Sequence, residues 1–466
     1  MSMFFQRLYH DGLAQASYLV GCQKTGEALV IDPHRDSAVY LNAAQAAGLR
    51  ISAITETHIH ADFVSGSREL AQITGAKLYL SAAGTAAWQY AFASSNPNVQ
   101  LINDGDSWMV GNLKIEVLHT PGHTPEHVIF MLTDTPAGDE PMGIFTGDLL
   151  FAGDVGRPDL LEKAAGIQGT SEAGAKDLFK SLQRIASLPD FLQVWPGHGS
   201  GSACGKALGA VPQSTLGYEK KVNWAFKQQN EADFVAAVLD GQPTPPPYFA
   251  AMKRINRDGP ELRPQRLPAL SLAEIKLDNR LVVDLRSAND FAQASIPGAL
   301  SLTSGAMLNR WAGWFVPVAS KVVLIGTAEA AKTAQTELSM IGIDQIEGYI
   351  TPDMLTEWLK TNPSQSYQRV PAANLSEQLD QAFVLDVRTP EEYANGHGAK
   401  AVNIPLNELP KRLAEIPNDQ PLIVHCQAGG RSPIAMSLLK PHFSQAMVEM
   451  SDGWNGWYQL KKERHV

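Results

Sequence analysis

Histidine and aspartate side chains, residue types that bind metal ions, gather in four loops of the N-terminal half. In THIHADF, His58, His60 and Asp62 follow the strand-like run ISAITE. Three later loops, each after another apolar run, add His123, Asp148 and His198. Loops at one end of a sheet can bring distant side chains to one ion. A single histidine is usually a satisfied core or surface residue, but this set predicts a metal site.

A cysteine near the C-terminus lies in a loop that favours a reactive thiol. In PLIVHCQAGGRSP an apolar strand leads into Cys426, and Ser432 and Pro433 suit the N-cap and the first position of a helix. Backbone N–H groups of the turn and the positive end of the helix dipole would stabilise a thiolate and then a persulfide anion, and Arg431 adds a positive charge. The turn consists of Gln427, Ala428, Gly429 and Gly430.

The composition narrows the classes of protein to which this chain can belong. Its 466 residues are 44% hydrophobic and 18% charged, which predicts a folded enzyme of about three domains. The formal net charge of -10, without a long Lys/Arg run, offers no basic surface for nucleic acid or an anionic membrane. The N-terminus lacks the pattern of a signal peptide, and no apolar run is long enough to span a bilayer. We therefore expect a cytoplasmic protein that binds neither nucleic acid nor a membrane. The three scattered cysteines are expected to be thiols.

Short β-branched runs that alternate with helical stretches must position these loops. This alternation over residues 1–240 predicts layered α/β or α+β packing. Residues 241–270 contain GQPTPPPYF and three further prolines, which predicts a semi-rigid linker. Beyond it, LVVDLRSANDFAQASIPGALSL is matched by FVLDVRTPEEYANGHGAKAVNIPL. Residues 271–360 and 374–466 are therefore predicted to be two copies of one α/β module of about 100 residues.

The N-terminal residues resemble the metallo-β-lactamase superfamily, whose signature HxHxDH is followed by a histidine, a bridging aspartate and a last histidine. The resemblance covers residues 1–240 and implies an αββα sandwich with metal at the strand ends. The sequence departs from the signature at Phe63, where the final histidine of HxHxDH belongs. In binuclear hydrolases of the superfamily that histidine helps to hold a second zinc ion. Because a phenyl ring cannot ligate a cation, we expect a single metal ion.

The persulfide dioxygenase branch of the superfamily implies which residues hold that ion. By resemblance the ligands are His58, His123 and Asp148, a facial triad of two imidazoles and one carboxylate. This triad is typical of non-haem Fe(II) oxygenases and leaves three positions for water, O₂ and substrate. The implied cofactor is one Fe(II) ion per chain. Residues that would orient water or the ligands from outside the coordination sphere are His60, Asp62 and His198.

The segment GDVGRPDL, which comes after Asp148 in the sequence, also resembles this branch. Arg157 and Asp159 would brace the metal loop or hold a substrate carboxylate, and the alternative is an ordinary surface ion pair. Cys204 follows shortly after the last histidine loop. Its thiol is either substrate-proximal and oxidisable or simply packed.

The last segment resembles the rhodanese family, whose active loop begins with a cysteine and closes with an arginine. The C-terminal copy has both, as Cys426 and Arg431, and the resemblance makes this cysteine the persulfide carrier. The middle copy has Gly326 in place of the cysteine, so we expect no sulfurtransferase chemistry from it. It would serve as a spacer, a packing surface or an oligomer contact.

The whole chain resembles fusions of a persulfide dioxygenase, an inactive rhodanese-like module and an active rhodanese. This implies oxidation of a low-molecular-weight thiol persulfide by O₂ to sulfite, and sulfur transfer that interconverts sulfite and thiosulfate during sulfide detoxification. We expect these small molecules as partners, and a homo-oligomer. Two alternatives stay open: a thioester hydrolase of glyoxalase II type with two zinc ions and a fused sulfurtransferase, or a sulfur-carrying interaction protein with a vestigial metal site.

Overall fold

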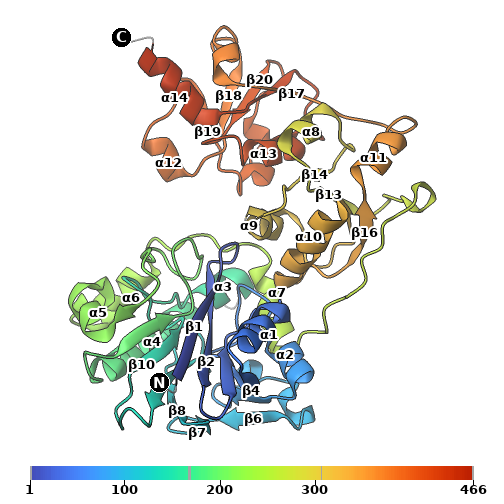
Figure 1. Ribbon diagram of the computed structural model, residues 1–466. Coiled ribbons are helices and arrows are strands. Elements are labelled where there is room, and N and C mark those ends of the chain that lie inside the picture. Colours follow the sequence, from blue (N-terminus) through green and yellow to red (C-terminus); the bar gives the residue numbers. More distant parts are fainter. Residues whose placement is uncertain (1–2, 166–168, 306, 464–466) are drawn as a thin grey trace. The chain divides into compact units, whose positions relative to one another are not determined.

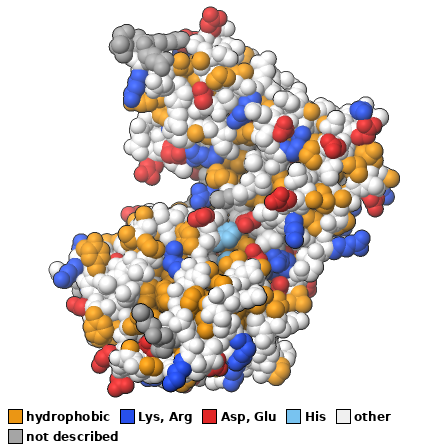
Figure 2. Space-filling model, in the orientation of Figure 1, with side chains coloured by type: hydrophobic (Ala, Val, Ile, Leu, Met, Phe, Trp, Pro, Cys, Tyr) orange, Lys and Arg blue, Asp and Glu red, His pale blue; other side chains and the backbone are white. Residues whose placement is uncertain are grey.

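The computed structural model describes residues 3–165, 169–305 and 307–463, and the chain divides into two compact units (Figure 1). The first unit comprises Met1–Pro264 together with Thr336–Asp344, and the second comprises Gln265–Gln335 and Gln345–Val466. Acidic and basic side chains are interspersed over the face shown in Figure 2. Within the described ranges, no helix has both the length and the apolar character needed to cross a membrane.

Two six-stranded sheets form the body of the first unit. The first sheet follows chain order, with β1 (Met3–His10), β2 (Gln15–Cys22), β3 (Glu27–Ile31), β4 (Arg50–Thr55), β5 (Lys77–Ser81) and β6 (Val99–Ile102). The second sheet contains, from one edge to the other, β12 (Ser214–Thr215), β11 (Gln193–Pro196), β10 (Gly143–Gly147), β9 (Val128–Asp134), β8 (Leu113–His119) and β7 (Ser107–Val110). Strands β1 to β3 pair antiparallel and β3 to β6 parallel.

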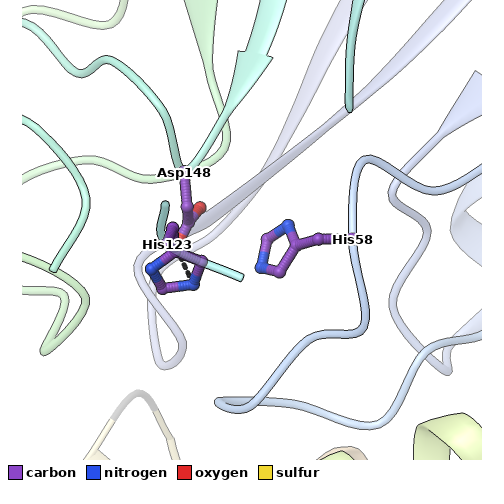
Figure 3. A group of neighbouring side chains, drawn as sticks. All are labelled: His58, His123 and Asp148. Atoms are coloured by element: carbon purple, nitrogen blue, oxygen red, sulfur yellow. Dashed lines mark ion pairs between the residues drawn. The ribbon is translucent and has the colours of Figure 1, made fainter. Parts of the chain in front are cut away.

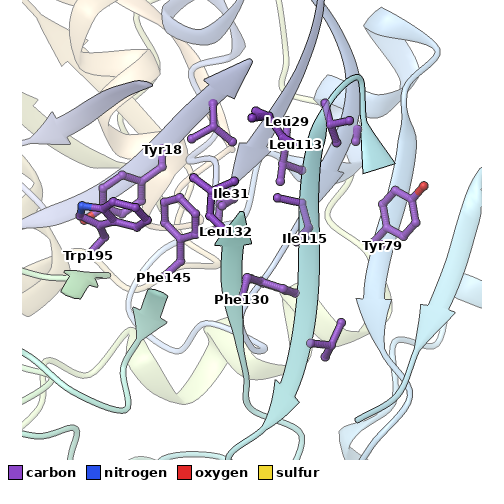
Figure 4. Packing of buried hydrophobic residues seen from close by; sticks show 14 of the residues in the cluster. Tyr18, Leu29, Ile31, Tyr79, Leu113, Ile115, Phe130, Leu132, Phe145 and Trp195 are labelled. Atoms are coloured by element: carbon purple, nitrogen blue, oxygen red, sulfur yellow. The ribbon is translucent and has the colours of Figure 1, made fainter. Parts of the chain in front are cut away.

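The main hydrophobic core lies between the two sheets. Alternate side chains of strands from both sheets meet there, as Figure 4 shows for Tyr18, Phe145 and Trp195. The ring centroids of Tyr18 and Phe145 are 5.1 Å apart, and those of Phe145 and Trp195 are 4.7 Å apart. Large aromatic rings bury much apolar surface, so these contacts hold the sheets face to face.

Helices cover the outer face of each sheet. Helices α1 (Ser37–Ala46) and α2 (Ser67–Thr74) pack on the first sheet, and α4 (Thr170–Ala186) and α6 (Glu231–Leu239) pack on the second. The layer order is therefore helix, sheet, sheet, helix, which confirms the predicted αββα sandwich. Shorter helices are α3 (Leu160–Ala165) and α5 (Leu216–Val222).

The segment predicted as a linker, residues 241–270, differs from the prediction because it contains helix α7 (Phe249–Asp258). The prolines stand on both sides of this helix and none lies inside it, so its ten residues keep every backbone donor. Phe249, Met252 and Asn256 are buried on the inward face of α7. The helix therefore belongs to the body of the first unit.

The direction of the strands explains why the four histidine and aspartate loops meet. Strands β8 and β10 both run antiparallel to β9, and β11 runs parallel to β10. The C-terminal ends of β8, β10 and β11 therefore lie on the same side of the sheet. The loops after them carry His123, Asp148 and His198. The loop after β4 carries His58.

The second unit contains two parallel sheets, one of four strands and one of five, in which four strands follow a matching order and a further strand is added at one edge of the second sheet. The first has the order β14 (Leu300–Ser301), β13 (Leu281–Asp284), β15 (Val322–Ile325), β16 (Ile346–Ile350). The second has the order β19 (Ala401–Asn403), β18 (Phe383–Asp386), β20 (Leu422–His425), β21 (Met447–Met450), β17 (Gln368–Val370). The matching order agrees with the internal repeat of the sequence. Their helices are α8 (Ala288–Gln293), α9 (Met307–Phe315), α10 (Ala328–Met340), α11 (Pro352–Trp358), α12 (Pro390–Ala394), α13 (Ser432–Leu439) and α14 (Gly453–Glu463).

Candidate metal centre and cysteine loop

Three of the predicted ligands come together in the first unit. The side chains of His58, His123 and Asp148 project from three different loops toward one point (Figure 3). One ligand atom of each lies within 4.8 Å of the others, and all three residues are buried. The Nε2 atom of His123 is 3.5 Å from Oδ2 of Asp148.

Hydrogen bonds set which nitrogen of each imidazole faces this point. The Nδ1 of His123 lies 2.8 Å from the carbonyl oxygen of Arg157, which can only accept, so Nδ1 carries the proton. The hydroxyl of Thr57 donates to Asp32, so Nδ1 of His58, 2.9 Å from that hydroxyl, is the donor there. Both rings therefore present an unprotonated Nε2, the atom that binds a metal ion.

Several buried polar atoms at this point make no hydrogen bond within the protein. Nε2 of His58 and both carboxylate oxygens of Asp148 lack a hydrogen bond, although the two residues are each 1% exposed. An unpaired buried donor or acceptor is costly, and a cation would satisfy all of these atoms at once. Burial lowers the pKa of both His58 and His123, which favours the neutral, metal-binding form. The donor set fits a divalent cation with two nitrogen ligands and one oxygen ligand.

A second group of buried side chains lies next to the first and consists of Asp62, His198 and Cys204. Their ligand atoms also lie within 4.8 Å of one another. Nε2 of His198 is 3.2 Å from Asp62 and 3.5 Å from Asp148, so this histidine connects the two groups. Burial, followed by the two nearby carboxylates, raises the pKa of the Cys204 thiol well above its ordinary value. This cysteine is 1% exposed, so its thiol is buried.

His60 is not part of the triad and is held by a residue that the sequence analysis missed. Its Nε2 lies 3.1 Å from Asp32, which also accepts hydrogen bonds from the backbone and side chain of Thr57. Burial alone would lower the pKa of His60, but the charge of Asp32 raises it to about 9. The ring of Phe63 lies against His60, with centroids 4.3 Å apart, and is fully buried. Asp32 therefore organises the loop without reaching the ligand atoms.

Arg157 and Asp159 form a buried, two-pronged ion pair. Nε and Nη2 of the arginine donate to the two oxygens of Asp159 at 2.7 and 2.8 Å. Nη1 donates to the carbonyl oxygens of Ala203 and Pro243. Because Arg157 is 0% exposed and its nitrogens are engaged, the geometry fits the bracing role and not a contact with a substrate carboxylate. Its own carbonyl holds His123, which links the brace to the metal centre.

The cysteine loop of the second unit directs backbone donors at sulfur. The N–H groups of Gly429 and Arg431 donate to Sγ of Cys426 at 3.2 and 3.3 Å. Gly429 has φ of +79°, and a Cβ there would lie 1.9 Å from the carbonyl oxygen of Ser451, so only glycine fits. Gln427, Ala428 and Gly430 complete the turn, as the sequence predicts.

Two details of this loop differ from the sequence interpretation. Ser432 is the first residue of α13 and not its N-cap, since Arg431 occupies the cap position and makes no side-chain capping bond. The Ser432 hydroxyl instead donates a hydrogen bond to Oε1 of Glu449 at 2.9 Å. The guanidinium of Arg431 is paired with Glu392 through two hydrogen bonds, so its charge near the sulfur is partly compensated. Neither acidic residue could be placed here from a motif.

Two family models match separate parts of the chain, and one solved structure covers most of it. Residues 10–198 match the model of the metallo-beta-lactamase superfamily, and residues 371–460 match that of the rhodanese-like domain. The crystal structure of a metallo-beta-lactamase from Staphylococcus aureus subsp. aureus COL superposes with a TM-score of 0.70 and 46% identity, covering 76% of this chain and 100% of that one.

Curated relatives carry the names of hydrolases. A hydroxyacylglutathione hydrolase from Maricaulis maris is 32% identical over 251 residues, which cover 53% of this chain and 82% of the relative. A probable polyketide biosynthesis zinc-dependent hydrolase from Bacillus velezensis is 27% identical over 214 residues, which cover 46% of this chain and 85% of the relative.

Proposed function

Since the chain belongs to the metallo-beta-lactamase superfamily and carries a C-terminal rhodanese-like domain, we propose that it is an iron-dependent persulfide dioxygenase coupled to a sulfurtransferase. The first activity would convert a low-molecular-weight thiol persulfide, O₂ and water into the thiol and sulfite. The second would move a sulfur atom between sulfite and thiosulfate through Cys426. The observation that carries the proposal is Phe63, a buried phenyl ring at the sequence position where a two-zinc site would need a further metal ligand.

His58, His123 and Asp148 would hold the iron ion through Nε2, Nε2 and a carboxylate oxygen. When bound, Fe(II) supplies the redox chemistry for O₂ and the open positions that a soft sulfur donor needs. The protein contributes orientation: the Arg157 carbonyl fixes the tautomer of His123, and the Thr57–Asp32 pair fixes that of His58. The triad residues are each at most 3% exposed, so the surrounding protein shields them from bulk water.

In the second unit Cys426 would accept sulfur. Its thiolate attacks the outer sulfur of thiosulfate, the sulfur–sulfur bond of thiosulfate breaks, and sulfite leaves with the bonding electron pair. The resulting persulfide anion remains within reach of the N–H donors of Gly429 and Arg431. The same residues allow the reverse transfer to sulfite, so the two units can exchange sulfite, persulfide and thiosulfate in either direction.

The test of the iron assignment is anaerobic purification, metal analysis, and O₂ uptake with several low-molecular-weight persulfides. We expect about one iron per chain and O₂-dependent sulfite formation. His123→Ala should abolish both, whereas His119→Ala should change neither, because the ring of His119 bonds to Pro125 outside the cluster. Two tightly bound zinc ions without O₂ uptake would refute the dioxygenase assignment.

A thioester hydrolase with two zinc ions is the second candidate. The group formed by Asp62, His198 and Cys204 lies directly beside the triad, and curated relatives are named as hydrolases. A binuclear zinc enzyme would hydrolyse an acylglutathione thioester and would be indifferent to O₂. Measuring thioester hydrolysis and O₂ uptake on the same metal-analysed sample separates the two candidates. A chain that merely carries sulfur would retain neither metal nor either activity.

A further inference from the structure

A buried carboxylate lies behind the cysteine loop, and no role in sulfur transfer has yet been assigned to it. Glu449, on β21, is 0% exposed and accepts the hydroxyl hydrogen bond of Ser432 at 2.9 Å. The oxygen of that hydroxyl lies 3.6 Å from Sγ of Cys426. Cysteine, serine and glutamate thus form a continuous chain that leads from the nucleophile into the interior.

We propose that Ser432 and Glu449 form a proton relay that takes the proton of the Cys426 thiol when the thiolate is generated. This inference rests on the sulfur-transfer role proposed above. Sulfur gives its proton to Oγ of Ser432 while the serine hydroxyl proton passes to Oε1 of Glu449. The products are a thiolate, an unchanged serine and a neutral glutamic acid, so protons and charge balance without another reactant.

The single proton of the serine hydroxyl determines the direction of the relay. In the resting arrangement that proton is used in the bond to Glu449, so Ser432 can offer only a lone pair to sulfur and must accept from the thiol. After transfer the hydroxyl points at sulfur, and the neutral Glu449 donates to Oγ. Ser432 then becomes a third donor to the thiolate, beside the N–H groups of Gly429 and Arg431.

The surroundings of Glu449 suit an acceptor that changes its charge. Burial is the largest influence on this carboxyl and raises its pKa, while the charge of Arg369 acts in the opposite direction. Nε of Arg369 donates to the carboxylate at 3.1 and 3.2 Å, which keeps the charged form available inside the fold. The phenol of Tyr367 also faces it, and burial together with the nearby Glu449 charge raises the pKa of that phenol.

Other charged groups also lie around the cysteine loop. Arg431 faces Cys426 and is paired with Glu392 of α12. Beneath the loop, Asp386 and Arg388 pair with each other, and His425 lies 3.8 Å from Asp386. None of the hydrogen bonds described for these five residues reaches Ser432 or Glu449, so the relay is a separate path.

The middle module provides an internal comparison. Strand register pairs Leu324 with Tyr349 in that module and Val424 with Glu449 in the C-terminal one, so Tyr349 stands where the glutamate belongs. Counting along the matching loop places Gly326 opposite the cysteine and Lys332 opposite the serine. The structural ion pair below the loop is kept in both copies, as Asp284–Arg286 and Asp386–Arg388. The three relay residues are therefore absent together in the module without a nucleophile, whereas the structural pair persists.

The relay is tested on the full-length chain by alkylating Cys426 with iodoacetamide over a range of pH, read by mass spectrometry of the peptide that contains it. Glu449→Gln keeps the shape and accepts the serine hydrogen bond but cannot take a proton. We expect the pH midpoint of alkylation to rise by about one unit, with an approximately tenfold lower rate at neutral pH. Ser432→Ala should give the same displacement, and the double variant should show no further change.

Two matched variants distinguish a relay from a purely structural role. Ser432→Thr retains the hydroxyl and should restore the wild-type midpoint. Ser437→Ala removes another buried hydroxyl of α13, which donates to the carbonyl of Ile434, and should leave the midpoint unchanged. A uniform loss of rate with an unmoved midpoint in Glu449→Gln would overturn the proposal, as would additive effects of the two single variants. Because alkylation needs no sulfur substrate, a failure of sulfur transfer itself would appear separately as normal titration without thiosulfate turnover.

Discussion

Phe63 is the residue that most restricts the chemistry of the metal centre. It lies directly after Asp62, is fully buried, and packs its ring on His60. A histidine at this position would add an imidazole to the group that already contains Asp62, His198 and Cys204. The phenyl ring instead leaves that group with an internal His198–Asp62 ion pair at 3.2 Å. The second group is thus partly satisfied without a cation, whereas in the triad Nε2 of His58 and both carboxylate oxygens of Asp148 make no hydrogen bond.

Phe63→His should therefore change the metal content of the protein. We expect bound metal to rise from about one to about two ions per chain, and O₂ uptake with a persulfide to fall, because the new imidazole completes a neighbouring zinc site. Inductively coupled plasma mass spectrometry and an oxygen electrode provide the two measurements. Phe63→Leu is the control for loss of the aromatic ring, and an equal gain of metal in that variant would contradict the explanation.

Cys426→Ser tests the division of labour between the two units. Sulfur exchange with thiosulfate should fall to the uncatalysed level, because a hydroxyl is a far weaker nucleophile and forms no stable persulfide. O₂ consumption should persist, since the metal ligands lie in the other unit, and sulfite should accumulate in place of thiosulfate. Quantifying both anions under one persulfide load decides the matter; undiminished thiosulfate in the variant would mean that another group carries the sulfur.

At the scale of elements, helix α7 supports the loop that carries the first metal ligands. Asn256 is buried and donates from Nδ2 to the carbonyl oxygens of His60 and Phe63, both at 2.8 Å. Its Oδ1 accepts from the backbone N–H of Ser65 at 2.9 Å. One side chain thus satisfies three backbone groups of the loop, which explains how an irregular segment can be buried.

Asn256→Ala should destabilise the fold by about 2–4 kcal/mol, because it leaves those backbone groups buried without partners. Bound metal should also be lost faster to a chelator, since the loop that holds His58 becomes mobile. Thermal unfolding and the rate of chelator-dependent metal loss measure the two effects. Arg254→Ala, an exposed position on the same helix, is the control and should match the wild type in both.

Helix α12 makes the stability of the cysteine loop depend on pH. Burial opposes ionisation of Glu392, but its hydrogen bonds with Arg431 and Thr389 lower its pKa to about 2. The folded-state pKa lies below that of an unfolded glutamate, about 4.3. The stabilisation is therefore present above that value and is lost as pH falls from about 4.3 toward 2.

Glu392→Gln should remove this acid-sensitive contribution. The pair is partly exposed, with 33% of the Glu392 side chain accessible, so solvent screening limits the loss to about 1 kcal/mol at neutral pH. Urea unfolding of the full chain, followed by exposure of Cys426 to a thiol reagent, reports on this domain. The difference between wild type and variant should shrink as pH falls below 4; a constant difference would contradict the pairing.

Site residues could be predicted from the sequence where they follow a strand directly. They could not be predicted where their hydrogen-bond partners are distant along the chain. His58, His123 and Asp148 each follow a strand directly, so their loops were recognisable from the sequence. Asp32 follows β3 directly, at φ +52°, and accepts a hydrogen bond from Thr57, 25 residues further along the chain. No spacing rule identifies such a residue. Glu449 lies on β21, whose sequence contains no recognisable motif. Its position behind the cysteine loop depends on the register between β20 and β21.

At the scale of the whole molecule, the first unit is completed by a segment from far along the chain. Arg35 is 2% exposed and donates to both carboxylate oxygens of Asp344 at 2.7 Å. It also donates to the carbonyl oxygens of Ser339 and Glu261. Residues 336–344 include the last turns of α10, which begins in the second unit and ends in the first.

Asp344→Asn should destabilise the first unit by about 1–3 kcal/mol, since it leaves the buried guanidinium without its counter-charge. The carboxylate is 32% exposed, so water compensates for part of the lost interaction. Urea unfolding, monitored by the loss of bound metal, reports on this unit. Glu329→Gln removes an exposed charge at the other end of α10 and should leave the midpoint of metal loss unchanged.

The shared helix also has a consequence for how the protein is made. During synthesis the chain leaves the ribosome from its N-terminus, so both sheets of the first unit emerge long before residues 336–344. Until that segment emerges, Arg35 has neither Asp344 nor the Ser339 carbonyl. The nascent first unit therefore lacks these contacts while most of the middle module is translated. During that interval a chaperone or the ribosome surface can bind the incomplete unit.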